Sequence, residues 1–142
     1  MKNLLINIGI NSKKAFTKKI SSKKKDKVLK DYCKLINENR KLIISHNKKD
    51  IKNAYKKKIN NNLIQRLILD DTKISNIINS IKQIIKLKDP TNRVLEKWKR
   101  PNGLNISKIS IPIGVIGVIY ESRPNVTSDV ASLCFKSGNT VI

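Results

Sequence analysis

Apolar residues recur with a helical period over much of residues 1–90, and the strongest example is a stripe of isoleucines. The isoleucines at positions 74, 77, 78, 81, 84 and 85 are related by three- and four-residue spacings, which places them on one face of a helix. Asp70 and Asp71 stand just before the stripe, where a carboxylate can cap the first turn. Asp89-Pro90 follows it, and proline disfavours helix at the preceding residue. This segment is therefore predicted to be a helix that packs its isoleucines into a core.

The rest of residues 1–90 is also predicted to be helical. Ser21 or Ser22 is a natural N-cap for a helix whose apolar residues keep the same period to about His46. Asn60-Asn61-Asn62 is a turn signal. Shorter helices are expected over residues 3–20, 50–59 and 63–69.

The pattern changes to short β-branched runs after Pro90. Residues 94–100 and 104–111 favour two strands. Pro101-Asn102-Gly103 favours a hairpin turn between them, because proline presets φ while asparagine and glycine tolerate positive φ. The inward and outward alternation changes parity between Ile106 and Ile109, which predicts a bulge there or a strand that changes sheets.

A nearly continuous apolar run from Ile111 to Tyr120 is the pattern of a strand buried on both faces, as in a parallel sheet. A helix capped by Asn125 or Thr127 is expected next, and Gly138 stands where a left-handed residue usually ends a helix. Residues 140–142 then restart a β-branched run, so the sequence predicts a β-α-β unit.

These segments together predict an α/β fold, in which N-terminal helices and a β-hairpin lead into a truncated Rossmann-like parallel sheet. The expected boundaries are residues 1–90 for the helical segment, 91–111 for the hairpin and 112–142 for an incomplete first β-α-β unit. A parallel crossover needs a second strand that covers its helix. We therefore expect a fragment of a longer protein or the product of a gene with a premature stop.

The net charge of +21 is unevenly spread. From residue 101 onward, three basic residues against two acidic ones give +1, so residues 1–100 carry the other +20. A basic nucleic-acid-binding module is one interpretation. A codon bias is another, because Lys, Asn and Ile share A/T-rich codons. Aromatic residues are only 4% of the chain and do not alternate with basic ones, which makes nucleic acid the less favoured partner.

Cys33 and Cys134 lie far apart, without a C-x-x-C motif or a neighbouring histidine, and are expected to be reduced thiols of a cytoplasmic protein. No His/Cys/Asp/Glu cluster predicts a metal site. Leu4 to Ile10 is too short and too quickly followed by lysines for a secretory signal. The run from Ile111 to Tyr120 is far shorter than the ~20 residues that span a bilayer, so no membrane contact is expected.

A polar cluster, Glu121-Ser122-Arg123-Pro124-Asn125, follows the predicted buried strand. Ligands of open α/β sheets bind at this carboxyl edge. Arg123 can bind an anionic group bidentately, and the Asn125 amide can face a developing oxyanion. The alternative is structural, with Arg123 paired to Glu121 and Asn125 capping the next helix. The spacing alone leaves both interpretations open.

Residues 111–142 strongly resemble the N-terminal part of the γ-glutamyl phosphate reductases, also called glutamate-5-semialdehyde dehydrogenases, within the aldehyde dehydrogenase superfamily. The full run is I-P-I-G-V-I-G-V-I-Y-E-S-R-P-N-V-T-S-D-V-A-S-L-C-F-K-S-G-N-T-V-I, in which Y-E-S-R-P-N-V-T is specific to this family. Asp89-Pro90 and the run from Arg100 to Leu104 are similar to the hairpin of the same family. Before residue 89 the resemblance is weaker.

The resemblance implies an NADPH-dependent oxidoreductase of proline biosynthesis that converts L-glutamyl 5-phosphate to L-glutamate 5-semialdehyde. A cysteine thiolate attacks the acyl phosphate, phosphate leaves, and hydride reduces the resulting thioester. By the same resemblance Asn125 is an oxyanion donor, residues 91–111 are an oligomerisation element of a homo-oligomer, and residues 112–142 open the nucleotide-binding domain. The residues implied to line the cofactor are Tyr120, Glu121, Ser122, Arg123 and Pro124.

This sequence departs from the family in one important respect. Neither Cys33 nor Cys134 matches the position of the nucleophile, which belongs to a later domain of the family. We therefore expect this polypeptide to be inactive alone. The alternatives are a basic nucleic-acid-binding module and the non-functional product of a decayed gene.

Overall fold

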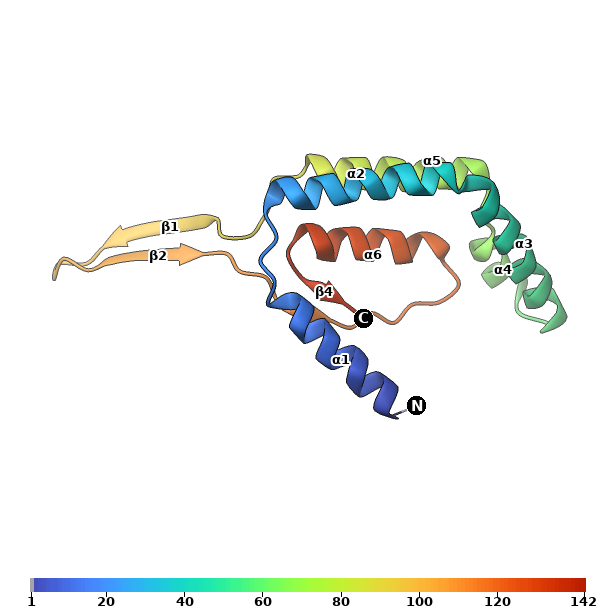
Figure 1. Ribbon diagram of the computed structural model, residues 1–142, viewed down its shortest axis with the longest axis horizontal. Helices are drawn as coiled ribbons and strands as arrows, with labels where there is room; N and C mark the ends of the chain where they lie inside the picture. Colours follow the sequence, from blue (N-terminus) through green and yellow to red (C-terminus); the bar gives the residue numbers. More distant parts are fainter. Residues whose placement is uncertain (1) are drawn as a thin grey trace.

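The computed structural model describes residues 2–142 as a body of helices from which a β-hairpin projects (Figure 1). Helices α2 and α5 lie side by side, and α6 packs against both. Helices α3 and α4 lie beyond one end of this pair. In chain order the elements are α1 (Lys2–Phe16), α2 (Ser22–Glu38), α3 (Arg40–Lys56), α4 (Asn61–Leu67), α5 (Asp71–Lys86), β1 (Val94–Lys99), β2 (Asn105–Ile109), β3 (Val115–Ile116), α6 (Pro124–Lys136) and β4 (Thr140–Val141).

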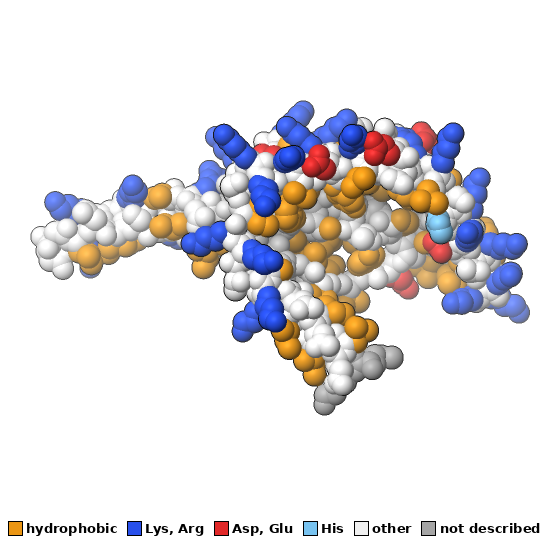
Figure 2. Space-filling model, in the orientation of Figure 1, with side chains coloured by type: hydrophobic (Ala, Val, Ile, Leu, Met, Phe, Trp, Pro, Cys, Tyr) orange, Lys and Arg blue, Asp and Glu red, His pale blue; other side chains and the backbone are white. Residues whose placement is uncertain are grey.

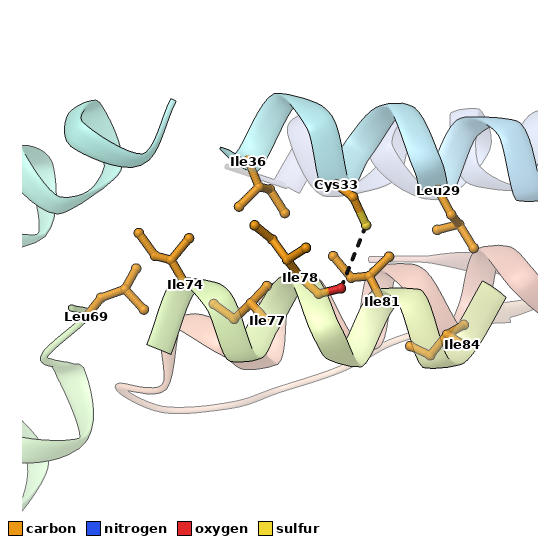
Figure 3. Close-up of a cluster of buried hydrophobic side chains, with 9 residues drawn as sticks. All are labelled: Leu29, Cys33, Ile36, Leu69, Ile74, Ile77, Ile78, Ile81 and Ile84. Carbon is orange, nitrogen blue, oxygen red and sulfur yellow. Dashed lines mark hydrogen bonds between the residues drawn. The ribbon is translucent and has the colours of Figure 1, made fainter. Parts of the chain in front are cut away.

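The core lies between α2 and α5 and is made of buried aliphatic side chains and one cysteine (Figure 3). Ile74 and Ile81 are 0% exposed, so the predicted isoleucine stripe is confirmed. Full burial of one such side chain contributes about 1.5–3 kcal/mol, which makes this face the main attachment of α5. The cluster consists of Leu29, Cys33, Ile36, Leu69, Ile74, Ile77, Ile78, Ile81 and Ile84.

Polar caps explain where the two central helices begin. The Asp70 carboxylate accepts a hydrogen bond from the Lys73 N–H at 2.7 Å, and the Ser21 hydroxyl accepts one from the Lys24 N–H at 3.4 Å. Each bond satisfies one of the N–H groups that a first helical turn leaves without an intrahelical partner. The predicted starts of α5 and α2 are therefore confirmed.

The helix predicted to run to about His46 is instead two helices that meet at Asn39. The Asn39 side-chain amide donates to the Leu35 carbonyl at 2.8 Å, a bond by which asparagine competes with the helical backbone. Because the chain turns here, the apolar residues on either side no longer share one face, and Leu35 and Leu42 are each 56% exposed. Helix α3 continues past His46 through most of the segment predicted as a separate helix.

Basic side chains cover the outer surface of α2 and the surroundings of α3, while hydrophobic side chains lie along α1 and the inward side of α2 (Figure 2). Among the four ion pairs of residues 2–142, none involves a lysine of the segment 48–58. These lysines are exposed and form a solvated face. Two lysines elsewhere in the chain, Lys25 and Lys136, are instead buried, at 3% and 4% exposed.

Strands β1 and β2 form the predicted antiparallel hairpin, and Gly103 in its turn has φ +86°. The predicted bulge exists, but it is on the other strand, between Val94 and Glu96 opposite the end of β2. Every residue of β1 is exposed, Trp98 by 40% and Leu95 by 57%. The hairpin thus presents apolar side chains to its surroundings over its whole length.

Strands β3 and β4 pair in parallel, with Val115 opposite Thr140 and Ile116 opposite Val141. Helix α6 connects them, so the predicted β-α-β crossover is confirmed. Gly138 has φ +74° just after the last turn of α6, which is the left-handed conformation predicted for it.

The strand predicted over residues 111–120 is wrong in its length and in its burial. Strand β3 contains two residues, Ile113 is 86% exposed, and Ile119 is fully exposed. A strand becomes buried on both faces only when a wide sheet carries helices on each side. Among residues 2–142 no further strand pairs with β3 or β4, so most of the apolar run lies at the surface.

Candidate functional site

Residues 120–125, termed the tip below, link the parallel pair to α6 and contain the most unusual backbone of the β-α-β unit. Ser122 has φ +40°, a region that residues with a side chain rarely adopt. Its hydroxyl oxygen is buried and has no hydrogen-bond partner among residues 2–142. Strained backbone and unpaired buried groups cluster at functional sites, which makes the tip a candidate ligand-binding segment.

Helix α6 begins at Pro124, with Arg123 as its N-cap residue. Proline is favoured at the first helical position because its missing N–H would have no intrahelical partner there. The predicted caps, Asn125 and Thr127, are therefore wrong, since both lie inside the first two turns. The Thr127 hydroxyl instead shares a hydrogen bond with the Tyr120 hydroxyl, which ties the start of the tip to the helix.

A cavity of about 520 Å³, the α3 cavity, lies between the tip and α3. The tip contributes Ser122 and Arg123 to its wall, and α3 contributes His46 and Asp50. The other lining side chains are mostly apolar and include Leu42, Ile43 and Leu67. Such a lining suits a ligand that combines an anionic group with an apolar ring.

A second cavity of about 270 Å³, the α5 cavity, lies on the other side of the tip. Three helices bring charged groups to it: Arg66 comes from α4, Lys73 from α5 and Asp129 from α6. The Asn125 amide and the Ser80 hydroxyl add neutral hydrogen-bonding groups. Charges of both signs therefore surround one small space.

Leu69 and Pro124 line both cavities, so the two spaces adjoin at the tip. Ser122 and Arg123 belong to the α3 cavity, whereas Asn125 belongs to the α5 cavity. One short polar segment thus borders two separate binding spaces. A reaction between two bound molecules requires this kind of proximity.

Neither structural alternative for the tip is found within the described residues. Arg123 does not pair with Glu121, and both side chains are exposed. The Asn125 side chain does not cap α6, because its amide donates to the Asp129 carboxylate at 3.1 Å. Glu121 and Arg123 are therefore accessible to a ligand.

Sequence reasoning missed the residues that face the tip across the two cavities. His46, Asp50, Arg66 and Lys73 come from helices whose orientation depends on the turn at Asn39 and on tertiary packing. Asp129 carried a local signal. It lies four residues after Asn125, which places the two side chains on one face of a helix.

The two cysteines have the properties of core residues. Cys33 and Cys134 are 7% and 8% exposed. Burial raises the pKa of both thiols, with the nearby Lys82 only partly opposing this at Cys33. A catalytic cysteine needs the thiolate form, so neither environment suits a nucleophile.

Two further features are absent from residues 2–142. No helix there combines the length and the apolar character needed to cross a bilayer. No three side chains among histidine, cysteine, aspartate and glutamate converge there to hold a metal ion.

Comparison with known sequences connects this chain to one enzyme. No family model matches it. The γ-glutamyl phosphate reductase of Nautilia profundicola is 51% identical over 118 residues, which are 83% of this chain and 29% of that protein. The γ-glutamyl phosphate reductase of Thermodesulfovibrio yellowstonii is 40% identical over 144 residues, covering 100% of this chain and 34% of its own length. The chain spans about a third of the length of the curated relatives that it matches.

Solved structures give the same result for the fold. The γ-glutamyl phosphate reductase of Thermotoga maritima matches 96% of this chain with a TM-score of 0.91 at 36% identity, over 34% of its own length. The enzyme of Saccharomyces cerevisiae matches 95% with a TM-score of 0.90 at 30% identity, over 35% of its length. The resemblance and the α/β fold predicted from the sequence are therefore confirmed.

Proposed function

We propose that this chain is the N-terminal part of an NADP-dependent γ-glutamyl phosphate reductase, a cytoplasmic oxidoreductase of proline biosynthesis. The complete enzyme reduces L-glutamyl 5-phosphate to L-glutamate 5-semialdehyde. The observation that carries the proposal is the TM-score of 0.91 to the Thermotoga maritima enzyme over 96% of this chain. The tip, bordered by two cavities, adds a site with the properties that a two-substrate reaction needs.

The α3 cavity and the tip fit a nicotinamide cofactor, which supplies hydride when bound. Within residues 2–142 the buried Ser122 hydroxyl makes no hydrogen bond, so it can bond to a ligand. The Arg123 guanidinium lines the same cavity and can bind an anionic group of the cofactor. The residues that would hold the cofactor are Tyr120, Glu121, Ser122, Arg123 and Pro124.

Asn125 is the proposed donor to the oxyanion of the tetrahedral intermediate. An asparagine amide has two N–H groups, and its bond to Asp129 uses one of them. The second N–H is therefore available in the α5 cavity. Preorganised donors of this kind stabilise negative charge as it develops, and removing one lowers kcat by about 10²–10³-fold.

The nucleophile must come from elsewhere in the complete enzyme, because both thiols of this chain are buried with raised pKa values. We infer that this chain has no reductase activity alone. The exposed apolar side chains of the hairpin, such as Leu95 and Trp98, suit a subunit interface, so the complete enzyme is proposed to be a homo-oligomer.

A chimera tests the proposal. The segment of the Thermotoga maritima enzyme that this chain matches is replaced by this chain, and NADP⁺-dependent oxidation of L-glutamate 5-semialdehyde is followed in the presence of phosphate. We expect activity from the chimera and none from the chain alone. Asn125→Ala should lower kcat of the chimera by about 10²–10³-fold, whereas the exposed Asn79→Ala on α5 should not. A folded but inactive chimera would refute the proposal, and reductase activity of the purified chain would refute its dependence on the missing nucleophile.

A further inference from the structure

The charged groups around the α5 cavity indicate which part of the substrate binds there. We propose that it binds the α-amino acid head of the glutamyl substrate. In this assignment, which rests on the function proposed above, the Asp129 carboxylate accepts hydrogen bonds from the α-ammonium group. Arg66 and Lys73 bind the α-carboxylate.

Size favours a small ligand. Ligand pockets usually measure about 300–1,000 Å³, and the α5 cavity at about 270 Å³ lies just below that range. A dinucleotide does not fit in such a space, but one amino acid does. The larger α3 cavity remains for the second molecule.

The charged groups retain free hydrogen-bonding capacity. Asp129 accepts one bond, from Asn125, and a carboxylate has about four acceptor sites. Lys73 gives one of its three N–H groups to the Ile68 carbonyl at 2.6 Å. Arg66 makes no ion pair within residues 2–142. The cavity can therefore pair both charges of a zwitterion.

The geometry of α6 places a donor and an acceptor for one substrate molecule side by side. Asn125 and Asp129 lie one helical turn apart, and the Asn125 amide meets the Asp129 carboxylate at 3.1 Å. In glutamyl phosphate the α-carbon is three bonds of about 1.5 Å from the reacting C5 carbon. A substrate of this length is short and flexible enough for its C5 oxygen to meet Asn125 while its α-ammonium group meets Asp129.

The charge pattern also distinguishes this assignment from a simple anion site. Asp129 repels a dicarboxylate or phosphate that has no ammonium group, because two negative charges would then face each other. The cavity should consequently prefer L-glutamate over glutarate, which lacks the α-amino group. It should also prefer L-glutamate over 4-aminobutyrate, which lacks the α-carboxylate.

The test is a set of ¹⁵N NMR titrations of the chain with L-glutamate, glutarate, 4-aminobutyrate and inorganic phosphate. We expect L-glutamate to shift the amides around Arg66, Lys73 and Asp129 and to bind about tenfold or more tightly than the other three probes. Asp129→Asn should lower the affinity for L-glutamate about tenfold and remove its advantage over glutarate. Lys73→Met should weaken L-glutamate and glutarate but not 4-aminobutyrate. Asp31→Asn on α2, an exposed and distant carboxylate, is the matched control.

Equal affinity for all probes, or phosphate binding that equals that of L-glutamate, would overturn the assignment in favour of an unselective anion site. A second measurement covers variants that fold poorly. In the active chimera, Asp129→Asn should raise KM for L-glutamate 5-semialdehyde about tenfold and leave KM for NADP⁺ unchanged. An active chimera without this change refutes the subsite but not the enzyme. An inactive chimera with selective L-glutamate binding refutes the enzyme but not the subsite.

Discussion

The Nζ of Lys25 donates to Oδ2 of Asp89 at 2.9 Å and to the backbone carbonyl of Lys136 at 3.2 Å. The Lys136 ammonium in turn pairs with Asp26 and donates to the Ile85 carbonyl at 3.0 Å. These bonds join the first turn of α2 to the last turns of α5 and α6. The two lysines are nearly inaccessible to solvent, so these protein partners replace the water contacts that each ammonium group loses on burial.

Asp89→Asn is expected to destabilise the chain by about 3–5 kcal/mol, because it leaves the Lys25 ammonium buried without its counter-charge. Urea unfolding followed by circular dichroism measures the change. Glu96→Gln on the exposed strand β1 is the control and should be near neutral. Equal stability of the two variants would show that the buried pair does not matter.

Stability should also fall in acid. Burial by itself raises the pKa of Asp89, but hydrogen bonds from Lys25 and Thr91 outweigh it and hold that pKa below its ordinary value. The folded state therefore binds this proton less readily than the unfolded chain. The contribution is complete above the ordinary carboxyl pKa of about 3.9 and is lost as pH falls through the depressed value. Urea midpoints between pH 3 and 7 should show this loss in the native chain and a smaller one in Asp89→Asn.

Ile81→Ala should cost about 2–5 kcal/mol, because Ile81 is 0% exposed and its neighbours can fill the resulting cavity only in part. Leu35→Ala removes a side chain that is 56% exposed and should change the free energy of unfolding by less than about 0.5 kcal/mol. Both values come from urea denaturation. Similar costs at the two sites would contradict the core between α2 and α5.

Gly138→Ala should lower the melting temperature. Its φ of +74° is unfavourable for alanine by about 1–2 kcal/mol. The new Cβ would also approach Pro112 Cγ and Thr91 Cγ2 to 3.1 Å. Gly9→Ala is the opposite case, because nothing lies within 4 Å of its Cβ position in α1, and it should stabilise the helix by about 0.5–1 kcal/mol. Thermal unfolding of both variants gives the comparison, and equal shifts would contradict it.

The sequence predicted those elements whose signals are local. Three features depend on only a few neighbouring residues and are present in the structure: the isoleucine period, the Asp70 cap and the hairpin turn that contains Gly103. The break at Asn39 was missed because the hydrophobic period continues across it while the backbone turns. The apolar composition of residues 111–120 predicts a buried strand, because composition indicates an apolar environment but does not indicate which segment supplies it.

The candidate site also contains one part that the sequence predicts locally and another part that only the tertiary structure reveals. The position of the tip after a β-branched run predicts a ligand-binding segment, and the tip borders two cavities in the structure. Its partners, such as Asp50 and Arg66, have no local pattern that distinguishes them from other surface charges. Only the arrangement of α3, α4 and α5 selects them.

The hairpin is held firmly at one end only. The Asn92 N–H donates to the Ser110 carbonyl at 2.8 Å, and the Ser110 N–H donates to the Arg93 carbonyl at 3.0 Å, close to the body of the molecule. Farther out, a two-stranded ribbon in water is marginal by itself. Protection of its amide protons from exchange with solvent should therefore decline steadily from Asn92 toward Gly103. Contact of another subunit with the apolar side chains of the hairpin would make this protection more uniform along the ribbon.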